Sequence, residues 1–142
     1  MAKRILVPVD GSEQAHEACA FVFREFSDAT LVLLHVINPA EAGYSAQASI
    51  PSFSEEWYDN EKARAEGIFD EIESDAAARD VTTERHVEVG RPTNIIVEFA
   101  EDNAVDQIVM GSHGRSGVQR LLLGSVAESV MRRSPVPVTV TR

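Results

Sequence analysis

The pattern of hydrophobic and polar positions divides the chain into short apolar runs and longer amphipathic segments. Five runs predict strands, at residues 5–9, 30–37, 81–89, 107–110 and 136–140. A continuous run such as TLVLLHVI at 30–37 is typical of a strand buried on both faces of a parallel sheet. The run at 81–89, VTTERHVEV, alternates between polar and apolar residues, which favours a position at the edge of the sheet.

Apolar residues at helical spacing occupy the four segments between these runs. A serine suited to capping a helix precedes the first two segments, Ser12 in one case and Ser52 or Ser54 in the other. Pro92 lies near the start of the third segment, where proline suits the first helical turn. The residues expected to face inward are Ala15, Ala18, Cys19, Val22 and Phe26, then Ala65, Ile68, Phe69, Ile72 and Ala76, then Ile95, Ile96, Phe99 and Ala100, and finally Val126, Ala127, Val130 and Met131.

Strands and helices alternate along the whole chain, and no linker or low-complexity segment interrupts them. The length of 142 residues suits one compact domain, so residues 1–142 are predicted to form a single domain. Strict alternation predicts an α/β fold of the Rossmann-like kind, an open five-stranded parallel sheet with helices on both faces. Residues 38–51 have no periodicity and contain two prolines and a glycine, so they are predicted to be a loop. The role of residues 38–52 stays open.

Composition narrows the class of protein. A formal net charge of −10 argues against general nucleic-acid binding, which requires a basic surface. No apolar run approaches the ~20 residues of a membrane span. The N-terminal MAKR leads directly into a strand and lacks the features of a secretory signal. A cytoplasmic protein with no membrane or nucleic-acid partner is therefore expected.

Cysteine and histidine provide no metal centre. Cys19 is the one cysteine, so an internal disulfide and a cysteine-based zinc site are excluded, and the residue is expected in the core. No pair of histidines has the spacing of metal ligands. His35 is expected in or beside the sheet, and His16 and His86 at the surface. No protein-built metal site is predicted.

The charges are unusual in kind and in distribution. There are 23 acidic residues against 13 Lys and Arg, of which only two are Lys, a balance found in halophilic proteins and also in ordinary acidic proteins. Residues 53–80 carry ten acids and three cations, whereas residues 107–142 carry one acid and five arginines. An anionic ligand would meet the least repulsion in the second region. A partner-binding surface would show the same asymmetry.

This region of low acidity contains the stretch GSHGRSGVQRLLLGS at 111–125, with four of the eight glycines of the chain. Glycine leaves backbone N–H groups open to phosphate oxygens, and a helix beginning near Gly124 and Ser125 would add its N-terminal dipole. Asp10 follows the first strand, where a carboxylate suits the diol of a ribose. The stretch is neither a GxxxxGK[ST] P-loop nor a GxGxxG dinucleotide motif.

The spacing of Gly111, Gly114 and Gly124-Ser125 resembles the G-2x-G-9x-G(S/T) signature of the ATP-binding universal stress proteins. The segments ILVPVDGS, LLHVI and SPVPVTV are also similar to that family, and the resemblance covers the whole chain. It implies strand order 3-2-1-4-5 and a homodimer formed through the last strand. It also implies an ATP site, with magnesium arriving on the nucleotide. The implied cofactor-binding residues are Val9 and Val36 for adenine, Asp10 for ribose, Met110, Gly111, Gly114, Gly124 and Ser125 for the triphosphate, and Pro8, Arg115 and Val126 beside them.

Several alternatives stay open at this point. Asp10 in DGS could shape a turn, and His113 and Arg115 could be solvated loop residues instead of phosphate contacts. Trp57 and Tyr58 are expected to pack on a helix, with closure over a ligand as the alternative. No residue set supplies a general base, so no catalytic residue is predicted. The expected function is a nucleotide-dependent regulatory or stress-protective role toward a signalling partner. A slow ATPase or nucleotidyl-transferring enzyme, or a dimeric interaction module with a vestigial pocket, are the alternatives.

Overall fold

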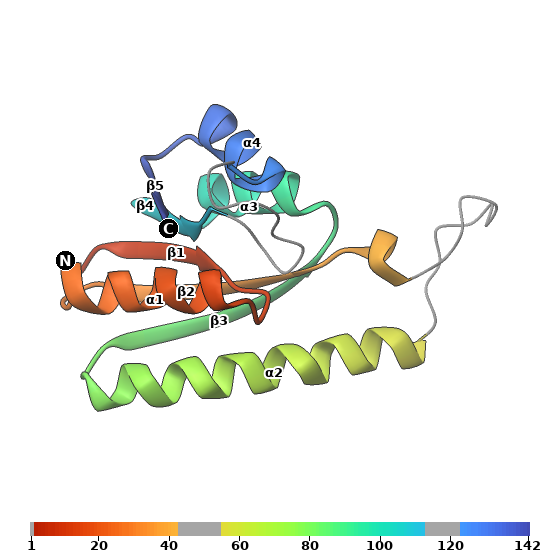
Figure 1. Cartoon of the computed structure of the whole chain (residues 1–142), viewed down its shortest axis with the longest axis horizontal. Coiled ribbons are helices and arrows are strands. Elements are labelled where there is room, and N and C mark those ends of the chain that lie inside the picture. The colour runs from red at the N-terminus through yellow and green to blue at the C-terminus, as the bar shows by residue number, and fades with distance from the viewer. Residues whose placement is uncertain (1, 43–54, 113–122) are drawn as a thin grey trace.

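The computed structural model describes residues 2–42, 55–112 and 123–142 (Figure 1). The strands are β1 (Arg4–Pro8), β2 (Thr30–Ile37), β3 (Thr82–Val89), β4 (Gln107–Gly111) and β5 (Val138–Thr141). The helices are α1 (Glu13–Glu25), α2 (Glu55–Ala78), α3 (Pro92–Asp102) and α4 (Ser125–Arg133), with a short 3-10 helix η1 (Pro39–Ala42). All five predicted strands and all four predicted helices are present.

The predicted loop at 38–51 is wrong at its start, because η1 forms there. Asn38 caps this turn: its side-chain oxygen accepts from the Ala40 amide at 3.1 Å, and its carbonyl accepts from the Glu41 amide at 2.9 Å. Pro39 suits the first position of such a turn because its missing N–H has no partner to lose there. Residues 43–54 lie outside the described part of the chain.

The strands form one parallel sheet of order β3-β2-β1-β4-β5. This confirms the order implied by the family resemblance, and it confirms β3 as an edge strand. β1 pairs with β2 on one side, Ile5 opposite Leu31, and with β4 on the other, Ile5 opposite Gln107. The chain therefore builds outward from β1 in both directions, and the strand order reverses between β1 and β4.

Helices α1 and α2 lie on one face of the sheet, and α3 and α4 lie on the other (Figure 1). An apolar core fills the space on each face. One core joins alternate residues of β1, β2 and β4 to α1 and α2, with Phe69 fully buried at its centre. The other joins the remaining strand residues to α3 and α4, with Leu6 and Ile108 fully buried. Alternation of side chains across each strand supplies both cores from the same apolar runs.

The helix faces were predicted with small errors in rotation. Met131 was expected to face inward, but its side chain is 48% exposed, whereas Val130 is fully buried. Consecutive helical residues point about 100° apart, so the Val130 contact turns Met131 toward solvent. Val97 is buried although it was not predicted, and Ile95 is only partly buried.

Two local expectations at α1, the cap at Ser12 and the burial of Cys19, are confirmed. The Ser12 hydroxyl caps the helix by accepting from the Ala15 amide at 3.1 Å. Cys19 is buried in the core, and burial, with a smaller effect of Asp75, raises the pKa of its thiol to about 12. His16 and His86 were predicted to lie at the surface, but both are half-buried. The His16 ring lies 3.0 Å from the Ser12 carbonyl, and the His86 ring packs against Phe99.

Candidate functional site

The candidate site lies at the carboxyl ends of β1 and β4. These strands are direct neighbours in the sheet, although about a hundred residues of sequence separate them. Asp10 follows β1, and Gly111 ends β4, so the two residues lie at the same edge of the sheet. In open α/β sheets this edge, where the strand order reverses, is the place where ligands bind.

The turn from β1 into α1 is shaped by Asp10. One of its carboxylate oxygens accepts from the Ser12 amide at 2.9 Å, so the residue has the turn-forming role considered as an alternative. Gly11 has a φ of +84°, a left-handed conformation that favours glycine. A carboxylate accepts several hydrogen bonds, so shaping this turn is compatible with binding a ribose hydroxyl.

Side chains from two other elements hold the backbone of this turn. The Val9 carbonyl lies 2.8 Å from Nδ1 of His35, a residue of β2 that is 1% exposed. The next carbonyl, that of Asp10, accepts from Nη2 of Arg64 on α2 at 2.9 Å. The Val9 amide donates to the Leu34 carbonyl at 2.9 Å. The end of β1 is therefore held on both sides before any ligand arrives.

The N-terminus of α4 is attached to the end of β4. The Gly124 amide donates to the Ser112 carbonyl at 2.7 Å, and the Ser112 amide donates to the Thr141 carbonyl at 3.0 Å. Gly124 is the N-cap, and as a glycine it makes no side-chain hydrogen bond to the first turn of the helix. The N-cap residue therefore leaves the first amides of α4 without a side-chain bond of its own, and such helix N-termini are suited to binding phosphate.

Gly111 has a packing role that the spacing of glycines did not reveal. A Cβ placed on it would lie 2.7 Å from Cβ of Gln14 and 2.9 Å from the Gln14 carbonyl oxygen. These distances are shorter than real contacts, so α1 approaches β4 closely only because this residue is glycine. Close packing by itself therefore requires glycine at this position, in addition to the phosphate contact that the family resemblance implies.

The remaining predicted residues are distributed over both faces of the sheet. Val9 is buried in the core under α1 and α2, whereas Val36, Met110 and Val126 belong to the core under α3 and α4. An adenine in contact with both Val9 and Val36 would therefore lie across the carboxyl edge of the sheet.

The other predicted residues lie at the ends of elements or outside the described residues. Pro8 is half-buried at the end of β1, and Ser125 is the first residue of α4, with an exposed side chain. His113, Gly114 and Arg115 lie outside the described residues.

Arg64 was not predicted, and neither was the contact of His35 with the turn. A signal for Arg64 exists in the sequence, because it precedes Ile68 by one helical turn and borders Ala65 on the inward face of α2. A charged residue at the margin of an apolar stripe is a candidate for a specific partner.

Trp57 and Tyr58 are half-buried at the start of α2, and Lys62 lies over the Tyr58 ring at 5.6 Å.

Within residues 2–42, 55–112 and 123–142, no group of three or more His, Cys, Asp or Glu is arranged to hold a metal ion. None of the described helices combines the length and the apolar character needed to cross a membrane.

Comparison with known proteins gives one consistent result. The model of the universal stress protein family matches residues 1–142. The universal stress protein MJ0577 of Methanocaldococcus jannaschii is 33% identical over 157 residues, covering 100% of this chain and 96% of that protein. The solved structure of protein MJ0577 is similar with a TM-score of 0.84 at 35% identity, over 99% of this chain and 96% of that one. A solved universal stress protein in complex with cAMP has a TM-score of 0.69 at 26% identity, over 99% and 97%.

Proposed function

This chain belongs to the universal stress protein family, and from that premise we propose that it binds ATP at the carboxyl ends of β1 and β4. The ribose lies on the Asp10 carboxylate, and the phosphates lie along the glycine stretch and the N-terminus of α4. Magnesium accompanies the nucleotide, held by phosphates and water. The bound nucleotide sets the activity of a cytoplasmic regulatory or stress-protective protein.

One observation carries this proposal: the hydrogen bond of 2.7 Å between the Gly124 amide and the Ser112 carbonyl. It joins the start of α4, with glycine as its N-cap, to the end of β4, beside the strand that leads to Asp10. A helix N-terminus and a carboxylate at one sheet edge complement the two polar parts of a nucleotide, its phosphates and its ribose diol. The relative solved with cAMP supports an adenine nucleotide as the ligand class.

Native mass spectrometry of freshly purified protein is the first test, because a tight binder retains nucleotide through purification. Calorimetry with ATP, ADP, AMP and cAMP then ranks the ligands, and a phosphate-release assay on the same sample separates binding from turnover. Absence of bound nucleotide together with no measurable affinity for any of the four would refute the proposal.

Two variants connect the affinity to the proposed residues. Asp10→Ala is expected to weaken ATP by roughly 1.5–3 kcal/mol, or about 10- to 150-fold, through loss of a charge-assisted hydrogen bond. Asp10→Asn is the matched control for the turn, because its amide oxygen still accepts from the Ser12 amide. Gly114→Val is expected to abolish ATP binding, since a side chain would prevent close approach of backbone to phosphate. Full affinity in a folded Gly114→Val protein would contradict the role of the glycine stretch.

A further inference from the structure

The guanidinium of Arg64 lies against the turn that carries Asp10. Arg64 is on α2, 54 residues away in sequence, and its Nη2 donates to the Asp10 carbonyl at 2.9 Å. The same nitrogen lies 3.7 Å from the position of a Cβ on Gly11. One cation of α2 therefore binds the Asp10 carbonyl and lies close beside the next residue, Gly11.

The turn has almost no room for another arrangement on this side. Ile68, one helical turn after Arg64, lies 3.2 Å from the same Cβ position on Gly11. The left-handed φ of Gly11 and the bond from the Ser12 amide to the Asp10 carboxylate define the rest of the turn. The backbone and the carboxylate of Asp10 are thus each held by a separate hydrogen bond, one from α2 and one from α1.

The placement of Arg64 is costly, which argues against a role in stability alone. Its Nη1 is buried, and it has no hydrogen-bond partner in the described part of the chain. A buried donor without an acceptor lowers stability. A neutral apolar side chain would cover Gly11 without this cost but could not donate to the Asp10 carbonyl, so the contribution of the guanidinium beyond packing is its hydrogen bond to the turn.

We infer that Arg64 is a positioning residue of the nucleotide site, which acts by holding Asp10 in the orientation that receives the ribose. The inference rests on the proposed function, and it names Arg64 as the residue that pre-organises the ribose part of the nucleotide site. Ribose binding then needs no rearrangement of the β1–α1 turn, and affinity is gained because the ordering has already occurred in the free protein. The effect of Arg64 on affinity passes through the Asp10 carboxylate and not through the phosphates.

The experiment is a double-mutant cycle on ATP affinity, measured by calorimetry. Arg64→Met keeps a flexible unbranched side chain, although a shorter one, and removes every donor, and it is expected to weaken ATP by about 5- to 10-fold. In an Asp10→Ala background the same change is expected to weaken ATP by less than about 2-fold, because the group that Arg64 positions is gone. Binding of inorganic tripolyphosphate, which has no ribose, is expected to change by less than about 2-fold.

Two further variants separate positioning from packing. Arg64→Lys retains a cation able to donate to the Asp10 carbonyl, and it is expected to recover at least half of the lost binding free energy. Arg79→Met is the matched control: its guanidinium lies 5.4 Å from the Phe23 ring, beyond the opposite end of α2, and its removal is expected to leave ATP affinity unchanged. Thermal melts show whether each variant is folded at the assay temperature. If Arg64→Met is unfolded, Arg64→Lys takes its place in the double-mutant cycle.

The outcomes are distinguishable. The role of Arg64 would be overturned if Arg64→Met weakened ATP binding equally in the wild-type and Asp10→Ala backgrounds. It would also be overturned if the variant lost affinity equally for ATP and for tripolyphosphate. Neither result would contradict nucleotide binding itself. Unchanged ATP affinity in folded Arg64→Met would likewise overturn the role of Arg64. A wild-type protein with no affinity for any adenine nucleotide would overturn the proposed function and this inference together.

Discussion

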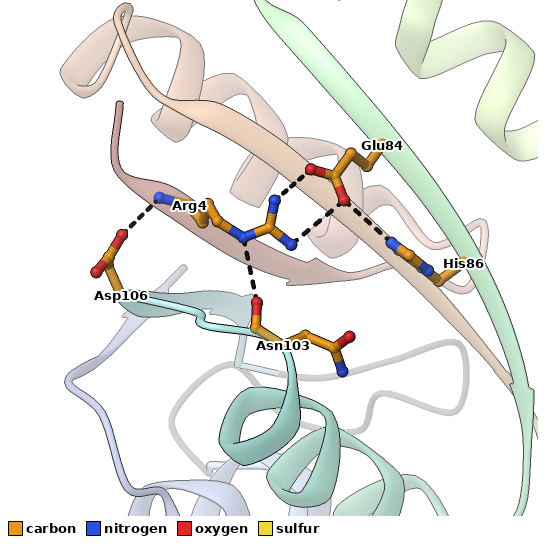
Figure 2. A network of polar contacts seen from close by, with 5 residues as sticks. All are labelled: Arg4, Glu84, His86, Asn103 and Asp106. Atoms are coloured by element: carbon orange, nitrogen blue, oxygen red, sulfur yellow. Dashed lines mark hydrogen bonds and ion pairs between the residues drawn. The ribbon is translucent and has the colours of Figure 1, made fainter. Parts of the chain in front are cut away.

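The guanidinium of Arg4 on β1 reaches across β2 and pairs with the carboxylate of Glu84 on β3, joining two strands that are not neighbours in the sheet (Figure 2). The same residue connects the sheet to the start of β4. Its Nε donates to the Asn103 carbonyl at 3.2 Å, and its amide donates to the Asp106 carboxylate at 2.8 Å. Arg4 thus connects β1 with β3, with the residue before β4 and with the C-cap of α3.

This arrangement predicts a specific dependence of stability on pH. The hydrogen bond from Arg4 lowers the pKa of the Glu84 carboxyl below its usual value of about 4.5, with a smaller lowering from His86. A carboxyl whose pKa is lower in the folded state stabilises the protein above the unfolded value, and this contribution is lost as the pH falls through the folded value. We expect the melting temperature of the wild type to exceed that of Glu84→Gln at pH 7. The difference should shrink steadily below about pH 4.5.

Thermal melts of the two proteins between pH 3 and pH 8 check this expectation. Because the side chains of Arg4 and Glu84 are 28% and 35% exposed, solvent screens the pair and the difference at neutral pH should be modest. Arg4→Met provides a second route to the same loss, and adding Glu84→Gln to it should cost little more. A difference that stays constant across the whole pH range would show that the Arg4 pair does not stabilise the fold.

Gly67 offers a stabilising substitution. It lies in the interior of α2, and a Cβ placed on it meets no atom within 4 Å. Gly67→Ala is expected to raise stability by about 0.5–1 kcal/mol, because alanine loses less backbone entropy in a helix. For a domain of this size the melting temperature should rise by roughly 2–4 °C. A fall in the melting temperature would contradict the open environment of this position.

Gly111→Ala is the matched contrast, measured by stability and not by binding. A Cβ there would lie 2.7 Å from Cβ of Gln14, so α1 or β4 must shift. Overpacking of this kind costs about 1–3 kcal/mol. The same substitution, glycine to alanine, is therefore expected to act in opposite directions at the two positions.

Salt should stabilise this acidic protein. Arg85 on β3 pairs with three carboxylates of one face of α2, those of Glu66, Asp70 and Glu73. Arg85→Met would leave these carboxylates facing one another, at a cost of about 0.5–1 kcal/mol in low salt because the groups are 28–72% exposed and solvent screens them. The melting temperature is expected to rise with potassium chloride in the wild type, through screening of a net charge of −10, and more steeply in the variant. A melting temperature of the wild type that stays constant or falls as potassium chloride increases would contradict this prediction.

The free edge of β5 is the expected dimer contact. The Ile108 amide donates to the Pro137 carbonyl, and the Ser112 amide donates to the Thr141 carbonyl, so alternate residues of β5 point their backbone groups at β4. The N–H of Val138 therefore points to the open edge. Val138→Pro is expected to weaken a dimer while preserving the fold, since proline is tolerated at edges.

Thr139→Pro is the paired control, because it removes a bond to β4 and should lower the melting temperature of the monomer itself. Light scattering across a concentration series measures the assembly of both variants. A wild type that is monomeric at micromolar concentration would exclude this interface.

Much of the architecture follows from local patterns. Apolar runs such as residues 5–9 and 30–37 predict buried strands because each residue of a strand covered on both faces needs an apolar partner. Ser12 predicts the start of α1 because its hydroxyl satisfies an amide within the next turn. The order of the strands came from the family resemblance, since alternation alone does not say on which side of β1 the fourth strand pairs.

Side-chain partners distant in sequence were decided by the tertiary structure. The alternation of apolar runs and amphipathic segments determined an α/β fold, and the glycine spacing pointed to Asp10 and the stretch at 111–125 as the site. Nothing local linked Arg64 to the Asp10 carbonyl or Arg4 to Glu84, pairs separated by 54 and 80 residues. The physical reason is that periodicity reports whether a position is buried, whereas these contacts depend on strand register, strand order and the rotation of each helix on the sheet. Met131, turned to solvent by the rotation of α4, and Gly111, glycine because α1 packs so closely on β4, were decided in the same way.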